Sequence, residues 1–364
     1  MVASGNRRRL PAVAAALPWA AWAVLRVTGT ERGFPLVPAM SFTPYAAGSA
    51  VLPLAVAVRA GARGAAVLSA GSGAVLAAAL LARRRSPGPA GVHDGARLRI
   101  ATVSLRRGLV QPVPVVDLVR RFGVDVLSVQ ELTPRAESGL RAGGITEHLP
   151  WAHVIPARPG VLASASGAVW SRLRVKKCDA VAGSFEQPTV RLAVPGARDV
   201  ELTAVHTMPP ATSPRSVRRW AEDLAALPAP DRDVLRILAG DFNATLDHAA
   251  LRAVLRTGWA DAAQRVGRGL AWTWRPLRLP GPRLALDHVL VDPRISVAAV
   301  AFVHLPGSDH RALVVDLVLP PDPAPDVHRP PPLGTARGTG ARRRAPSRGE
   351  HGHGERARDV GRGR

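Results

Sequence analysis

The chain has 364 residues, with 49 Lys and Arg against 27 Asp and Glu and a formal net charge of +22 at pH 7. This excess of positive charge favours anionic partners in general, but it does not single out nucleic acid as one of them. Cys178 is the only cysteine, which excludes an intrachain disulfide and a cysteine-based metal site.

Long apolar segments occupy the first 85 residues. Residues 10–27, 38–58 and 64–82 are predicted to be three transmembrane helices, because about 17–25 apolar residues suit a helix that crosses a bilayer. Alanine-rich helices buried in a protein core are the alternative. Arginines lie in equal numbers on the two sides of these segments, so only the arginines at residues 7–9 favour an orientation. They predict a protein of the cell membrane with a cytoplasmic amino terminus and an extracytoplasmic remainder.

Two segments rich in proline and glycine flank residues 97–320. Residues 86–96 are typical of a linker, and residues 321–364 have almost no large apolar side chain, which predicts a disordered tail. The tail contains ten Arg and five acidic residues, a net charge of +5. Binding of nucleic acid or anionic lipid by the tail is therefore an alternative function with weak support.

Residues 97–320 have the pattern of an α/β domain, in which short apolar runs alternate with amphipathic stretches. The apolar runs predict strands over residues 98–103, 124–129, 168–170, 189–194, 200–206, 285–291, 297–303 and 313–319. Helices are predicted over residues 113–122, 214–226 and 247–256. So many strands, several of them without a helix in between, predict two packed sheets with helices outside.

The segment Leu235–Asn243 is an apolar run that ends in Gly-Asp-Phe-Asn. If it is extended, Asp241 and Asn243 project to the same face and Phe242 to the opposite one. Gly240 would then allow a turn or the close approach of a ligand. A carboxylate and a carboxamide on one rim suit a hydrated metal ion and an attacking water. A strand that ends in an Asx-rich turn is the alternative.

Polar clusters also stand at the ends of other predicted strands. They are Gln130-Glu131, His206, Asp287-His288 and Ser308-Asp309-His310. Each has an ordinary explanation alone, as a helix cap, a turn cap or a histidine whose hydrogen bonds are satisfied. Because strand ends gather at one rim of a sandwich, we expect the clusters to converge.

The order of these motifs, from Gln130-Glu131 through Gly-Asp-Phe-Asn to Ser308-Asp309-His310, resembles the endonuclease/exonuclease/phosphatase superfamily, which has the DNase I-like fold. The resemblance covers residues 97–320, and with the apolar segments the chain is similar to a bacterial membrane-anchored branch. It implies a four-layer α/β/β/α sandwich preceded by about three transmembrane helices. It also implies divalent-metal-dependent hydrolysis of a phosphodiester in nucleic acid, a lipid headgroup or a small phosphate ester.

The resemblance further implies which residues hold the metal ion. Glu131 would be the main ligand of Mg²⁺ (or Mn²⁺), and Asp309 would be a further carboxylate on the metal side. The family usually has an Asn at the end of the first strand, in a Thr-x-Asn-Leu pattern. Here the sequence is Thr102-Val103-Ser104-Leu105, so Ser104 would hold the metal weakly or through a water.

The remaining motif residues would act on the substrate. Asp241 would orient or deprotonate the attacking water, and Asn243 would hold that water or a phosphate oxygen. His206 would donate to a non-bridging phosphate oxygen, and His310 would be the second imidazole at the phosphate, oriented by Asp287.

Thr273-Trp274 matches a Thr-Trp pair often found near the substrate face in this family, with a core tryptophan as the alternative. Because Ser104 replaces the usual carboxamide, the alternative function is a catalytically weakened member that acts as a surface binding or scaffold protein.

Overall fold

The computed structural model describes residues 2–84, 95–277 and 281–321. The predicted linker, apart from residues 95 and 96, lies outside these ranges, and so does the predicted tail apart from Pro321.

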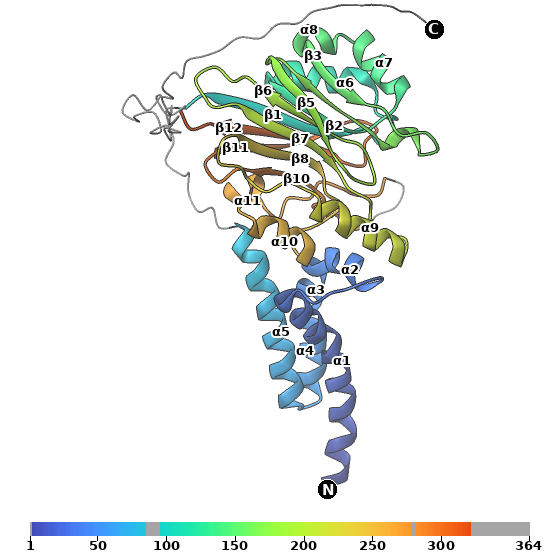
Figure 1. Cartoon of the computed structure of the whole chain (residues 1–364). Coiled ribbons are helices and arrows are strands. Elements are labelled where there is room, and N and C mark those ends of the chain that lie inside the picture. Colours follow the sequence, from blue (N-terminus) through green and yellow to red (C-terminus); the bar gives the residue numbers. More distant parts are fainter. Residues whose placement is uncertain (1, 85–94, 278–280, 322–364) are drawn as a thin grey trace, which may run out of the picture. The chain divides into compact units, whose positions relative to one another are not determined.

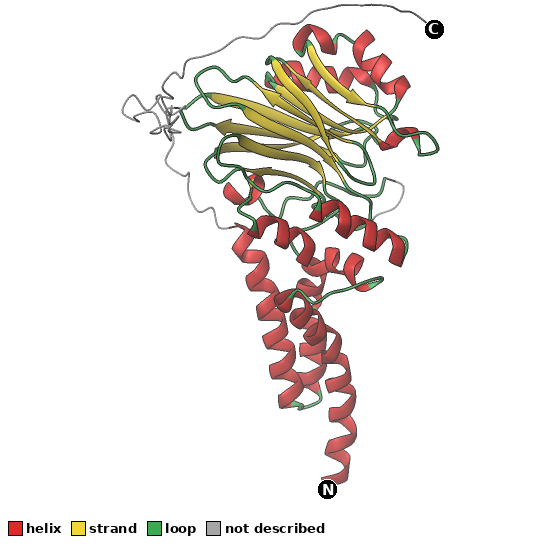
Figure 2. Cartoon of the chain, viewed as in Figure 1, coloured by secondary structure: helices red, strands yellow, loops and turns green. Residues whose placement is uncertain are grey.

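Two six-stranded mixed sheets form the α/β part of the described chain (Figures 1 and 2). The first sheet has the order β11 (Ser296–His304), β12 (Arg311–Val318), β1 (Arg97–Ser104), β2 (Val126–Leu132), β4 (Ser166–Ser171) and β3 (Trp151–Ile155). The second has the order β5 (Val175–Val181), β6 (Gln187–Leu192), β7 (Val200–His206), β8 (Leu235–Asp241), β10 (Asp287–Val291) and β9 (Ala260–Asp261).

The main core lies between the two sheets. Alternate residues of the central strands point into it, among them Ile100 on β1, Leu202 on β7 and Ile237 on β8. The intervening residues point outward to the helices, as Ala101 and Leu238 do. Both faces of the central strands are therefore largely apolar, which explains why these strands are rich in apolar residues on both alternating faces.

Helices cover the outer face of each sheet (Figure 2). Side chains of α6 (Pro112–Phe122), α7 (Pro134–Ala142) and α8 (Ile145–His148) pack on the first sheet. Side chains of α9 (Pro214–Ala225) and α10 (Ala249–Arg256) pack on the second, and α11 (Ala262–Arg265) lies at its edge beside β10. The arrangement is the four-layer α/β/β/α sandwich expected from the resemblance.

The amino-terminal region is helical. It contains α1 (Val2–Thr28), α2 (Leu36–Ala39), α3 (Thr43–Ser49), α4 (Val51–Arg59) and α5 (Arg63–Leu81). Arg9–Thr28 and Arg63–Arg84 are long and apolar enough to cross a membrane, and Leu36–Ser49 with Val51–Arg59, bent by 44°, makes a third candidate if it counts as one span. Small residues such as Ala12 and Ala57 make the contacts between helices, while Leu10 and Val67 are exposed at 71% and 74%.

The ends of these helices are bound to the segment that follows β8. Arg26 Nε donates to Asp247 Oδ1 at 2.6 Å, and Arg83 donates to the same carboxylate, which is fully buried. The backbone N–H of Ala249, at the start of α10, donates to Glu31. The helical region is thus joined through buried charges to the loop that carries Asp241 and Asn243.

Candidate active site

Three of the expected site residues come from neighbouring strands of the second sheet. Asp241 ends β8 and pairs with His206 at the end of β7 and with Asp287 at the start of β10. All three side chains are buried. Because paired residues on adjacent strands lie side by side, the sheet brings these groups together even though they are far apart in sequence.

Asn243 meets Asp241 through a turn and not through the predicted extended segment. Its φ is +46°, in the left-handed region that Asn adopts more readily than most residues. The Asn243 backbone N–H donates to Asp241 Oδ1 at 2.8 Å, and Nδ2 donates to the carbonyl of Thr207 at 2.9 Å. Phe242 packs into the core, and its carbonyl accepts a bond from Trp220 Nε1 at 3.1 Å. Asn243 Nδ2 also lies 3.2 Å from Asp241 Oδ2, so the two side chains meet and Phe242 turns away as expected, although the backbone at Asn243 is not extended.

Gly240 also has a different role from the one expected. A Cβ at this position would lie 1.9 Å from the carbonyl oxygen of Val205 on β7. The glycine thus permits the close approach of two strands.

His310 is held by carboxylates on both of its ring nitrogens. Nδ1 bonds Asp287 Oδ2 at 2.8 Å, and Nε2 lies 3.9 Å from Asp241 Oδ2. The Thr273 hydroxyl accepts the backbone N–H of Asp287 at 3.0 Å and so fixes the start of β10. Burial alone would lower the pKa of His310, but Asp287, Asp241 and Asp309 outweigh it and raise the pKa to about 10. The imidazole is therefore a cation at neutral pH.

Asp241 and His206, at the ends of β8 and β7, respond in opposite ways to burial. Burial and the nearby Asp287 raise the pKa of Asp241, while the charge of His310 opposes them. Burial and the charge of His310 lower the pKa of His206 to about 3, so this imidazole is neutral. The His206 ring stacks on Phe185 at 4.4 Å, and its Nδ1 is buried without a partner among the described residues.

Glu131 enters the site from the first sheet, on a β-bulge. The pairing of β2 with β4 shifts register between Val129 and Leu132, and Glu131 has φ +54°. One carboxylate oxygen accepts the backbone N–H of Arg107. Burial raises the pKa of Glu131, the charges of His310 and Arg107 lower it, and Asp309 raises it. Glu131 is therefore electrostatically coupled to the groups on the turn before β12.

The turn before β12 brings Asp309 next to Ser104. The Ser308 hydroxyl donates to the carbonyl of Ser104 at 3.1 Å, and Trp274 Nε1 donates to Asp309 Oδ2 at 3.3 Å. Trp274 is half-buried and contacts the site carboxylate, so it is not a core tryptophan. Within the described chain, Asp309 Oδ1 and Ser104 Oγ are buried and have no hydrogen-bond partner. Two oxygen atoms at this rim are thus left open to a ligand or a water.

Several residues that support the site were not expected from the sequence. Gln187 on β6 accepts the backbone N–H of His206 at 3.2 Å. His288 bonds Asp261 and the carbonyl of Ala244, each at 2.8 Å, and so holds the turn after Asn243 from behind. His288 belongs to the motif Asp287-His288, and strand alternation turns its side chain to the opposite face of β10 from that of Asp287. Gln187 gives no signal in a single sequence.

Comparison with known proteins identifies the group of proteins to which this fold and site belong. The sequence model of the Endonuclease/Exonuclease/phosphatase family matches residues 103–310. The chain belongs to this family. Members are in general divalent-metal-dependent hydrolases that act on phosphate esters. No curated protein matches the chain.

Solved structures with the same fold are distant in sequence. An endonuclease/exonuclease/phosphatase from Beutenbergia cavernae DSM 12333 is 20% identical, with a TM-score of 0.48 over 62% of this chain and 72% of that one. A D. rerio TDP2 complexed with single strand DNA product is 14% identical, with a TM-score of 0.49 over 61% of this chain and 98% of that one. A humanized D. rerio TDP2 is 15% identical, with a TM-score of 0.48 over 61% of this chain and 98% of that one.

The residues of this family member fit a hard divalent metal ion. Asp241, Asp287 and His310 offer ligand atoms within 4.8 Å of one another. However, the raised pKa of His310 favours its protonated form, which has no lone pair to give, so carboxylates are the better donors here. The carboxylates of Glu131 and Asp309 are the oxygen ligands that Mg²⁺ prefers, and the open Asp309 Oδ1 is the atom that such an ion would satisfy.

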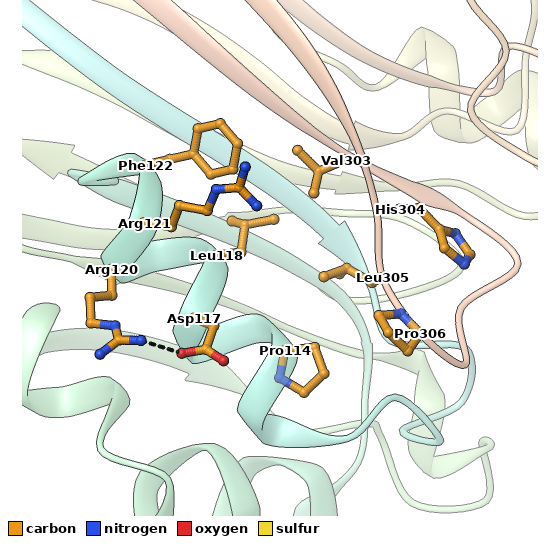
Figure 3. Close-up of a pocket in the computed structure, with 10 residues that line it drawn as sticks. All are labelled: Pro114, Asp117, Leu118, Arg120, Arg121, Phe122, Val303, His304, Leu305 and Pro306. Atoms are coloured by element: carbon orange, nitrogen blue, oxygen red, sulfur yellow. Dashed lines mark hydrogen bonds and ion pairs between the residues drawn. The ribbon is translucent and has the colours of Figure 1, made fainter.

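A separate pocket of about 600 Å³ lies between α6 and the turn after β11 (Figure 3). None of the expected site residues lines it. Arg120 is paired with Asp117 there, and Arg121 lies 5.5 Å from the centre of the Phe122 ring.

Proposed function

We propose that this protein is a membrane-anchored, Mg²⁺-dependent phosphoesterase that hydrolyses a phosphodiester by attack of water. The observation that carries the proposal is the buried group of Asp241, Asp287 and His310, which stands beside the unsatisfied Asp309 Oδ1 at the same rim. A buried cation flanked by carboxylates and an open carboxylate oxygen suits a site that receives an anion together with a metal ion.

Glu131 and Asp309 would hold the metal ion, and Ser104 would hold a water of its shell. When bound, the ion would neutralise phosphate charge and make a water more acidic. The Arg107 backbone N–H fixes the orientation of the Glu131 carboxylate, and Trp274 does the same for Asp309. These contacts leave oxygen atoms free while they restrict rotation of both side chains.

The second sheet would supply the groups that act on water and phosphate. Asp241 would accept a proton from the attacking water in its ionised form, and because burial raises its pKa to about 8, this step should be favoured at mildly alkaline pH. Asn243 would orient the same water, because its amide is locked by the Thr207 carbonyl. His310, a cation fixed by Asp287, would stabilise charge on the phosphate, and neutral His206 would donate one hydrogen bond to it.

We further propose that α1, the bent pair of Leu36–Ser49 and Val51–Arg59, and α5 each cross the cell membrane. Three crossings with a cytoplasmic amino terminus would put the α/β domain outside the cytoplasm. The exposed apolar side chains of these helices support contact with lipid. Membrane fractionation, followed by protease treatment of intact cells and of opened cells, tests this. Cleavage of the domain only after opening would contradict the orientation.

Hydrolysis by the full-length chain in detergent tests the proposed activity. Bis-p-nitrophenyl phosphate, plasmid DNA and phospholipid vesicles should be compared with Mg²⁺ and with EDTA. We expect EDTA to abolish hydrolysis of whichever ester is cleaved. A folded protein inactive on all three would favour the second candidate, a catalytically weakened binding or scaffold protein, for which the substitution at Ser104 is the supporting observation.

A further inference from the structure

Four non-glycine residues of the described chain have a left-handed backbone. They are Arg106 (φ +48°), Arg107 (φ +55°), Glu131 (φ +54°) and Asn243 (φ +46°). Such a conformation costs an L-residue about 1–3 kcal/mol, and it persists where surrounding contacts enforce it, often at functional sites. Glu131 and Asn243 already belong to the proposed site. The other two are consecutive residues in the turn that follows β1.

This turn is bound to both sides of the rim that holds Glu131 and Asp309. The Arg107 backbone N–H donates to Glu131, and Arg106 Nη1 donates to the carbonyl of Gly307 at 3.2 Å, directly before Ser308-Asp309-His310. Gly108 closes the turn against Thr133, where a Cβ would lie 2.2 Å from the threonine Oγ1. The backbone of the turn and the side chain of Arg106 thus have structural partners.

The side chain of Arg107 differs from that of Arg106. Within the described residues, its guanidinium has neither a hydrogen bond nor an ion pair, and the residue is exposed. Its charge nevertheless acts on the Glu131 carboxylate. Glycine or asparagine would fit this backbone with less strain, so the position carries a cation against its conformational preference.

We infer that Arg107 is a substrate-binding residue whose guanidinium binds a non-bridging oxygen of the phosphate, with Arg106 as a positioning residue. The inference rests on the proposed function, in which phosphate is bound at this rim. An arginine fork matches phosphate oxygens in geometry, and its attraction grows with the charge of the ligand. The site should therefore bind a doubly charged phosphate more strongly than a singly charged diester.

Binding of inorganic phosphate in the presence of Mg²⁺, measured by isothermal titration calorimetry on the full-length protein, tests this without catalysis. We expect Arg107→Ala to weaken binding about ten-fold, which is the loss of one charge-assisted interaction of about 1.4 kcal/mol. Arg107→Gly, which relieves the left-handed backbone, should lose as much, and Arg107→Lys should recover part of the affinity. Arg121→Ala, which removes an exposed arginine of α6 that contacts none of the proposed site residues (Figure 3), is the matched control and should change binding less than two-fold.

A second readout separates this inference from the proposed function. The KM for p-nitrophenyl phosphate should rise more in Arg107→Ala than the KM for bis-p-nitrophenyl phosphate. If the wild type hydrolyses neither ester but phosphate binding still depends on Arg107, the proposed activity fails and the inference stands. Equal phosphate binding by wild type and Arg107→Ala, or no binding by either, overturns the inference even if hydrolysis is Mg²⁺-dependent.

Discussion

Replacement of Asp247 by Ala should separate the amino-terminal helices from the segment that follows β8. The Asp247 side chain is fully buried, and those of Arg26 and Arg83 are exposed at only 13% and 6%. Removal of the carboxylate leaves two guanidinium groups with little solvent and no counter-charge at this point. Breaking a buried pair by removing one partner costs about 3–5 kcal/mol, and here one residue serves two pairs.

The structure also ranks the three substitutions at this site by the stability that each should cost. Arg83→Ala and Arg26→Ala each leave the other arginine on Asp247, so each should cost less than Asp247→Ala. Arg26 is the more exposed of the two arginines, so Arg26→Ala should lower the stability least. For a domain of this size, about 1 kcal/mol lowers the midpoint of thermal unfolding by roughly 2–4 °C. Asp247→Ala should therefore lower it by roughly 6–20 °C.

Thermal unfolding of the full-length protein in detergent, followed by the fluorescence of its eight tryptophans, measures this effect. Asp117→Ala is the matched control, because it removes a carboxylate from an exposed pair with Arg120. Such pairs contribute about 0–1 kcal/mol. If Asp247→Ala lowers the midpoint of thermal unfolding no more than Asp117→Ala does, buried charges do not join the two regions.

Three further results are expected. His310→Ala should lower turnover by about 10² to 10⁴, and Asp287→Asn should lower it less, because it only misorients His310. If Asp287→Asn leaves turnover unchanged while His310→Ala lowers it, the proposed pairing of the two residues is wrong. Ser104→Asn should tighten Mg²⁺ activation or raise turnover about ten-fold, since a carboxamide reaches further than a hydroxyl, and an unchanged Mg²⁺ titration would remove Ser104 from the site. Burial lowers the pKa of His248 to about 4, so the unfolded chain binds the proton more readily. The contribution of neutral His248 to the free energy of unfolding, roughly 3 kcal/mol, should be complete above pH 6.5 and lost as the pH falls towards 4. Unfolding of His248→Gln should depend less on pH in that window, and an equal slope in both proteins would contradict the assignment.

The fold was predictable from sequence where strands are buried on both faces. β1, β2, β7 and β8 are rich in apolar residues, broken only by a few polar ones such as Arg99, Glu201 and Arg236, because one face meets the other sheet and the opposite face meets helices. Of the four edge strands, β11 was predicted over residues 297–303, whereas β3, β5 and β9 were not. β5 is exposed along most of its length, so nothing requires an apolar pattern there, and β3 is exposed or half-buried throughout.

The site residues could be proposed because each ends or begins a strand, and strand pairing then brings Asp241, Asp287 and His206 together. Strand periodicity could not predict the left-handed turns at Asn243 and Arg107, since φ depends on tertiary contacts that a polar pattern does not encode. The same limit applies to Arg26 and Asp247.

These two residues are 221 positions apart, and each alone is typical of a solvated surface charge. Only the packing of the helix ends on the α/β domain makes them a buried pair. Sequence therefore gives the local elements and the motif positions, and the folded chain decides which charges lose their solvent.

The central claim is that a divalent metal ion held by Glu131 supports hydrolysis of a phosphate ester. A Mg²⁺ titration of hydrolysis by the full-length protein, compared between wild type and Glu131→Gln, tests it most directly. The amide keeps the size of the side chain and can still accept the backbone N–H of Arg107, so the fold should be retained. We predict that Mg²⁺ stimulates the wild type and does not stimulate Glu131→Gln, while both proteins unfold at similar temperatures. Equal Mg²⁺-dependent turnover in the two proteins would contradict the claim.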